Sequence, residues 1–104
     1  MFMRYKLKTT DQFWADFQES ADYIAHTLEN PIAAERLLDE LVKNAKTLTE
    51  FPKASKPYFS PPEVSETYYA LPVKNYFAFY VVRDGVVEFR RFLYSRSDLS
   101  ERLK

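Results

Sequence analysis

The side chains best suited to chemistry lie in one short stretch near the C-terminus of this 104-residue chain. A guanidinium group binds phosphate or carboxylate through two parallel hydrogen bonds, and a neighbouring phenol can add another donor. Such a cluster is typical of a cleft that holds phosphates or an acidic protein segment. Its candidate members are Arg90, Arg91, Tyr94, Arg96 and Asp98.

If this stretch is a β-strand, its side chains alternate between the two faces of a sheet. The alternation places Arg90 and Tyr94 on one face. It places Arg91 on the other face, together with Phe89 and Leu93. An arginine between two apolar neighbours needs a partner, so the environment of Arg91 must supply an acid or a ligand.

Two roles are open for Arg91. It either pairs with a carboxylate such as Asp98 or Glu88 and ties the C-terminal tail to the sheet, or it lines a cationic cleft. Arg96 lies beyond the expected strand end, where a side chain can reach a partner without being needed for packing. We therefore expect Arg96, with Tyr94 nearby, to be the principal functional residue.

The residue inventory limits other catalytic devices. The chain has no cysteine, which excludes disulfides and thiolate metal sites, and its single glycine excludes a glycine-rich phosphate loop. The only histidine, His26, lies off the apolar stripe of its expected helix and near no nucleophile motif. The acidic residues are spread along the helices instead of clustering, so we expect no metal and no cofactor.

Composition predicts one domain over residues 1–104, because 46% of the chain is hydrophobic. No segment approaches the roughly 20 apolar residues that cross a bilayer, so we expect a cytoplasmic protein with no membrane partner. The formal net charge is zero, which argues against holding nucleic acid by phosphate neutralisation. We expect no direct sequence-specific DNA binding by this chain alone. Residues 68–104 nevertheless carry seven cationic against four acidic side chains.

The elements that must position the candidate site begin with a strand. Cationic and apolar residues alternate over residues 4–9. Thr9 followed by Gln12 resembles a capping box, which predicts that a helix begins there. Apolar residues then recur at steps of three and four, and this helix is expected to end at about Glu29.

A second helix is expected to start at once. Asn30 is a good N-cap, Pro31 suits the first helical position, and an apolar stripe continues to Leu48. The short connection makes the two helices an antiparallel hairpin. Residues 52–62 hold four of the six prolines, so an extended loop without regular structure is expected there.

Three aromatic and β-branched runs then predict an antiparallel meander with tight turns at residues 74–75 and 84–85. The runs are Tyr68 to Val73, Tyr76 to Arg83 and Val86 to Tyr94. The middle run is apolar over residues 76–82, as in a central strand covered on both faces. The expected fold is α+β: an N-terminal strand, a two-helix antiparallel hairpin, a three-stranded antiparallel meander packed against the helices, and a short C-terminal tail.

The meander resembles the C-terminal part of the RelE/ParE superfamily of small bacterial toxins. That superfamily reads there approximately Arg-x-Leu-Pro-Val, a turn, Tyr-x-x-Phe-Tyr, a turn, and Arg-x-Leu-His/Tyr-Gly-Arg-Arg-Asp. The strand–helix–helix order agrees over the rest of the chain. The matching positions are Leu71, Pro72, Val73, Tyr76, Phe79, Tyr80, Arg91, Leu93, Tyr94, Arg96 and Asp98.

The resemblance implies the toxin component of a type II toxin–antitoxin, or plasmid stabilisation, system. Such a toxin inhibits growth and is neutralised by a cognate antitoxin whose flexible segment wraps it. One branch of the superfamily cuts mRNA in the ribosome, and the other poisons DNA gyrase. The resemblance therefore implies an antitoxin partner and either gyrase or the ribosome with its mRNA as the target.

The ribonuclease branch places lysines and arginines around the scissile phosphate. Three of those positions correspond here to Tyr68, Ala70 and Phe77, none of which can stabilise an anionic transition state as a cation does. Only Arg96 remains from that set, with Tyr94 as a second candidate catalytic residue. RelE-like cleavage is therefore disfavoured and stays as an alternative.

The chain also departs from the ParE-like pattern at two positions. Tyr69 stands where an arginine is expected, and Ser97 replaces the second arginine of Arg-Arg-Asp. The resemblance still favours a ParE-like action on gyrase. We add Lys74 and Tyr76, at the first hairpin turn, to the candidate surface for the target or the antitoxin.

A non-toxin reading is also open. A small module could bind single-stranded RNA by stacking bases on aromatic strand residues. The residues available for such stacking are Tyr76, Tyr80, Phe92 and Tyr94.

Overall fold

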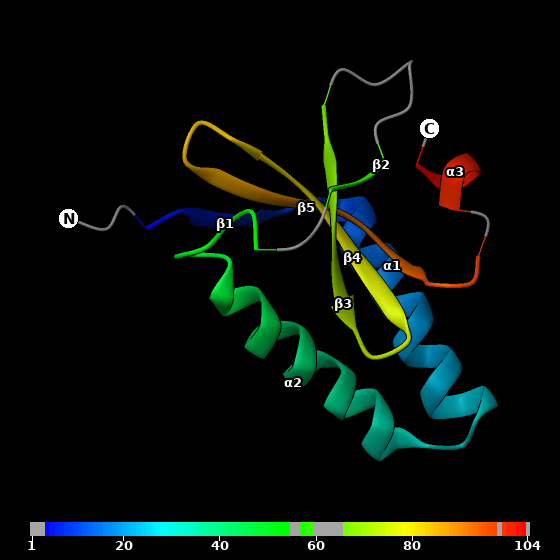
Figure 1. The fold of residues 1–104 in the computed structure, drawn as a ribbon. Helices are drawn as coiled ribbons and strands as arrows, with labels where there is room; N and C mark the ends of the chain where they lie inside the picture. The colour runs from blue at the N-terminus through cyan, green and yellow to red at the C-terminus, as the bar shows by residue number, and fades with distance from the viewer. Residues whose placement is uncertain (1–3, 55–56, 60–65, 98, 104) are drawn as a thin grey trace.

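The computed structural model describes residues 4–54, 57–59, 66–97 and 99–103. Its elements are β1 (Lys6–Thr9), α1 (Asp11–Asp22), η1 (Tyr23–Thr27), α2 (Pro31–Thr47), β2 (Pro57–Phe59), β3 (Tyr68–Val73), β4 (Tyr76–Arg83), β5 (Val86–Tyr94) and α3 (Leu99–Arg102). The helices α1 and α2 meet at a short connection and diverge from it, and α3 lies apart from both (Figure 1). The predicted α+β class and order of elements are confirmed.

The five strands of the described residues form one sheet in the order β1-β5-β4-β3-β2. The pairs β3–β4 and β4–β5 are antiparallel, so the predicted meander is confirmed, and β4 is central as expected. β1 is parallel to β5 and forms one edge of the sheet. The prediction of no regular structure in residues 52–62 is wrong for Pro57–Phe59, which pairs with β3 as the other edge. An edge strand tolerates proline because its N–H need not join the ladder.

The two faces of the sheet are covered by different elements. One face packs against α1 and α2 through a core that includes Phe13, Leu37, Tyr80 and Phe92. The other face is covered by Leu99 and Leu103 from the C-terminal segment; its buried strand residues are Tyr68, Ala70, Phe79, Val81 and Leu93. This arrangement explains the apolar β4: its successive residues serve two separate cores.

The first helix begins one residue later than a cap at Thr9 would place it. The hydroxyl of Thr10 accepts from the Phe13 N–H at 3.1 Å, whereas the Gln12 amide donates to Asp16 at 2.8 Å. The predicted capping box is therefore wrong. Thr9 is still the last residue of β1, because its pairing with Phe89 extends the parallel ladder that far.

The connection between the helices contains unusual backbone. After Asp22 the helix widens into the π-helical turn η1, and Glu29 then adopts a left-handed φ of 51°. The predicted cap of α2 is confirmed, since the Asn30 side chain accepts from the Ala33 N–H at 3.1 Å. Among the described helices, none is long and apolar enough to cross a membrane.

The two hairpin turns differ in their residue types. Asp84 and Gly85 have φ values of 52° and 75°, the two positive values that a type I′ turn requires. Lys74 adopts a φ of 56° in the other turn, a conformation that costs a residue with a Cβ atom about 1 kcal/mol. This turn lies beside the larger pocket described below.

Candidate functional site

A β-bulge sets the directions of the arginines in β5. Phe79 pairs with Arg91 while Tyr80 pairs with Phe89, so Arg90 is an extra residue in the ladder. The extra residue shifts the alternation, and Phe89 and Phe92 consequently lie in the same helix-facing core. The sheet faces that were predicted for Arg90, Arg91 and Tyr94 from strict alternation are therefore wrong.

The corrected faces separate the candidate residues differently. Arg91 shares a face with Leu93 and not with Phe89. Arg90 and Tyr94 lie on opposite faces: the Arg90 side chain bonds to Glu88 and Tyr68, and Tyr94 packs against Tyr76 on the helix side. The candidate residues of β5 therefore lie on both faces of the sheet and do not form a single cluster.

The partner of Arg91 is Asp16 of α1. Arg91 Nε donates to Asp16 Oδ2 at 2.7 Å and Nη2 donates to Oδ1 at 3.0 Å, while Nη1 donates to the Arg102 carbonyl at 2.8 Å. The expected pairing with an acid is correct in kind, but the expected partner Glu88 is wrong. Asp98, the other expected partner, lies outside the described residues.

Asp16 is almost completely buried, with 4% of its surface exposed. Its Oδ2 also accepts from the backbone N–H of Phe92 at 3.0 Å. Burial by itself raises the pKa of Asp16, but hydrogen bonds from Arg91, the Phe92 N–H and Gln12 outweigh burial and hold the pKa below its ordinary value. Its position between Phe13 and Phe17 on the buried helix face is the signal that could have identified this acid from sequence.

Arg90 is engaged in a second network. Its Nε lies 2.7 Å from Glu88 Oε1, and its Nη1 lies 2.7 Å from Glu66 Oε2. Burial alone lowers the pKa of Arg90, but hydrogen bonds to Glu88 and Tyr68 raise it above its ordinary value. Arg90 therefore links β5 to the residues before and within β3.

Arg96 lies on the surface in the turn that follows β5. Within the described ranges, no hydrogen bond or ion pair engages its side chain. Ser97 folds this turn back, because its N–H and its hydroxyl both donate to the Tyr94 carbonyl, at 3.0 and 2.5 Å. Tyr94 itself is 43% exposed, so the phenol and the guanidinium are both accessible.

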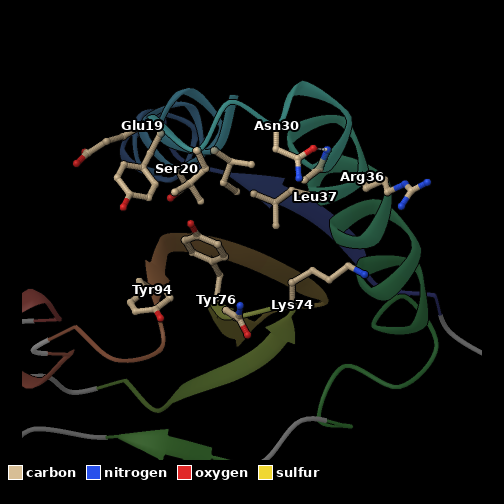
Figure 2. A pocket seen from close by; sticks show the side chains of 13 residues that line it. Glu19, Ser20, Asn30, Arg36, Leu37, Lys74, Tyr76 and Tyr94 are labelled. Carbon is tan, nitrogen blue, oxygen red and sulfur yellow. Dashed lines mark hydrogen bonds between the residues drawn. The ribbon is translucent and has the colours of Figure 1, made fainter. Parts of the chain in front are cut away.

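Tyr94, Tyr76 and Lys74 line a pocket of about 810 Å³ between the helix hairpin and the sheet. Figure 2 shows the Tyr76 hydroxyl directed toward the helix that carries Ser20, with Tyr94 beside it. The Tyr76 ring stacks on Phe92 with centroids 5.0 Å apart. Burial raises the pKa of Tyr76, although a hydrogen bond with Ser20 partly offsets it. The structure thus brings three of the candidate residues together.

The positions that would carry ribonuclease cations are parts of a core. Tyr68 and Ala70 are buried against Leu99 and Leu103, and Phe77 packs against the same cluster. The hypothesis that RNA bases stack on aromatic strand residues is wrong for Tyr80 and Phe92, because these side chains are 0% and 1% exposed. Of the four residues proposed for stacking, Tyr94 alone is exposed.

Sequence reasoning missed an apolar groove at the other end of the helix hairpin. It measures about 360 Å³ and lies between the start of α1 and the end of α2, with Phe89 among its lining residues. Leu7, Trp14 and Val42 line it and are 39%, 43% and 45% exposed. Large exposed apolar side chains at the edge of both helical stripes were the available signal. Within the part of the chain that the structure describes, no group of three or more His, Asp and Glu side chains could hold a metal ion.

Comparisons with known proteins agree with this architecture. The family model described as the ParE toxin of the type II toxin-antitoxin system parDE matches residues 7–99. A solved structure titled as the chromosomal ParDE TA system from P. aeruginosa superimposes with a TM-score of 0.69 at 18% sequence identity, over 88% of this chain and 97% of that one. No curated protein is detectably similar in sequence.

Proposed function

This chain belongs to the ParE toxin family of type II toxin–antitoxin systems, and from that membership we propose that it arrests bacterial growth by acting on DNA gyrase in the cytoplasm until a cognate antitoxin neutralises it. The family match extends over residues 7–99, which leaves out only Lys6 of β1 and all but the first residue of α3 among the described elements. The family assignment therefore rests on almost the whole fold and not on a single motif.

One observation favours gyrase over the ribosome. The positions where the ribonuclease branch carries cations hold Tyr68, Ala70 and Phe77, which pack against the C-terminal segment. A general acid/base ribonuclease needs charged donors around the scissile phosphate, and each such donor contributes about 3 kcal/mol to the transition state. A packed apolar core cannot supply them, so a binding action on a protein target is the better fit.

We propose that Arg96 and Tyr94 contact the target. Both are exposed at the end of β5, and no described residue occupies the guanidinium of Arg96. Arg90 and Arg91, by contrast, are already bound to carboxylates of the same chain. A side chain that has no structural partner can be used for recognition without loss of stability.

The antitoxin has a separate place to bind. The apolar groove beside Leu7, Trp14 and Val42 lies next to β1, whose outer edge is unpaired in the described sheet. Lys8 and Lys46 also line this groove. We propose that an amphipathic antitoxin segment with acidic flanks covers it, because the apolar face would fill the groove and the flanks would meet the lysines.

Two assays run side by side test the proposed target. Purified wild-type toxin should inhibit supercoiling by gyrase and should not promote ribosome-dependent mRNA cleavage. Induction of the chain in bacteria should stop growth, and co-expression of the adjacent gene, expected to encode a chain of roughly 60–100 residues, should restore it. Cleavage of mRNA without any effect on gyrase would assign the protein to the other branch.

A further inference from the structure

We propose that the pocket between η1, α2 and the β3–β4 turn docks an acidic peptide segment of the target, whose apolar side chain lies over Tyr76 and whose carboxylate meets Arg36 and Lys74. This inference rests on the proposed function, because it assumes that the chain acts on a protein target. It assigns a binding role to Arg36 and Leu28, which lie outside the motif near the C-terminus.

The pocket has the form of a site for a peptide side chain. Its volume of about 810 Å³ exceeds that of one aromatic side chain and leaves room for the adjoining backbone. Leu37 and Tyr76 supply apolar walls from α2 and the sheet (Figure 2). Ile24 of η1 also lines the pocket. Leu28 and Tyr23 also line it, and they are 56% and 51% exposed, which is a large apolar area for a surface without a partner.

The charges at the rim favour a carboxylate. Arg36 projects from α2 at the edge of the pocket (Figure 2), is exposed, and has no ion-pair partner within the described ranges. Lys74 is held only loosely, with its Nζ 4.0 Å from Glu40 Oε1. An incoming carboxylate can therefore bind both cations without breaking a close ion pair.

Two uncommon backbone conformations border this pocket. The π-helical turn η1 contributes Tyr23 and Ile24 to the wall, and π-helical turns are frequent at functional sites. Lys74 holds a left-handed φ of 56° in the β3–β4 turn, which directs its side chain toward α2 (Figure 2). Strained backbone is retained mainly where the resulting geometry is used.

The position of the pocket assigns the peptide to the target and not to the antitoxin. Tyr94 lines the pocket and is one of the two residues proposed to contact the target, so the pocket adjoins that proposed surface. The groove proposed for the antitoxin lies at the opposite end of α1 and α2. Glu19 lines the pocket and Glu40 lies next to Lys74, so a continuous phosphate backbone would meet more like charges than a single carboxylate held at the rim by Arg36 and Lys74.

The test uses two substitutions in the pocket and two matched controls outside it. Arg36→Glu reverses a rim charge, and Lys43→Glu makes the same change at an exposed position of α2 that does not line the pocket. Leu28→Glu places a carboxylate in the apolar wall, and Ile32→Glu does so at a residue that is 61% exposed and outside the pocket. Each variant is measured for growth arrest, for inhibition of gyrase supercoiling and for affinity to the antitoxin.

The concentration that gives the same inhibition should be at least about tenfold higher for each pocket variant than for wild type. The affinity of each pocket variant for the antitoxin should stay within about twofold of wild type. The controls should behave as wild type in all three measurements. Full toxicity of both pocket variants would overturn the inference, as would an equal loss in the controls. Loss of antitoxin binding in the pocket variants would assign the pocket to the antitoxin instead. If wild type arrests growth without affecting gyrase, only the gyrase target fails, and growth arrest by the variants still decides the role of the pocket.

Discussion

The carboxylate of Asp16 and the guanidinium of Arg91 are 75 positions apart in the chain and are joined by hydrogen bonds of 2.7 and 3.0 Å. The same carboxylate accepts from the Phe92 N–H, and the same guanidinium donates to the Arg102 carbonyl. This pair therefore connects α1, β5 and α3. The helix α1 contributes to one core, α3 contributes to the other, and β5 contributes to both.

Loss of the arginine should mainly affect stability. Arg91→Ala leaves the buried Asp16 without its cation, and we expect the free energy of unfolding to fall by about 3 kcal/mol. Chemical denaturation with a constant m-value measures this change. Asp16→Asn combined with Arg91→Ala should cost less than the sum of the single changes. An Arg91→Ala protein that is fully stable but not toxic would instead assign this arginine to function.

Acid should weaken the same pair. The pKa of Asp16 is lowered in the folded protein, so its contribution to stability is fully present above the unfolded value of about 3.9 and is lost as pH falls through the lower folded value. The stability difference between wild type and Asp16→Asn should therefore be largest near neutral pH and should shrink below about pH 4. Denaturation curves at several pH values test this, and a difference that does not change with pH would contradict it.

The exposed arginine after β5 should affect activity alone. We expect Arg96→Ala to abolish growth arrest, because this guanidinium is accessible and no described residue binds it. Stability and antitoxin affinity should change by less than about 0.5 kcal/mol, as is usual for surface substitutions. Arg102→Ala, at another exposed arginine, is the matched control and should remain toxic. Full toxicity of Arg96→Ala would remove Arg96 from the site.

The antitoxin should stabilise the fold through the apolar groove. Saturating cognate antitoxin should raise the melting temperature of the toxin, since a ligand of the folded state stabilises it by mass action. Val42→Glu places a charge in the groove and should weaken antitoxin binding at least about tenfold. Leu38→Glu is the control on the same helix, with a similar exposure of 42% and a position outside the groove. A melting temperature that does not move with antitoxin would exclude this role for the groove.

The connection between the helices can be stabilised by one substitution. Glu29 is exposed and has a φ of 51°, which glycine adopts without a steric cost. Glu29→Gly should raise the free energy of unfolding by up to about 1 kcal/mol. Glu29→Ala removes the same carboxylate but keeps the Cβ atom, so it should give no such gain. Equal effects of the two variants would show that strain at this position is negligible.

The sequence by itself determined the elements whose causes are local. Periodicity located both helices of the hairpin, and turn chemistry located the three meander strands with their correct ends. The side chain of Asn30 and the left-handed Asp84-Gly85 pair act within a few residues, so their roles can be read from short segments. The family motif was also local, because it lies along two adjacent hairpins.

Only the tertiary structure decided which face each arginine occupies and which acid it meets. The bulge at Arg90 arises from the register of β5 against β4. It places each later side chain of β5 on the opposite face from the one that strict alternation predicts. Asp16 reaches Arg91 because α1 packs beside β5, a contact that no spacing in the sequence encodes. The pocket around Tyr76 likewise exists because the helix hairpin and the sheet bring residues 19–37 against residues 74–94. Contacts between segments distant in the chain depend on the packing of the whole core. For that reason the sequence predicted some residues of the site but not their spatial arrangement.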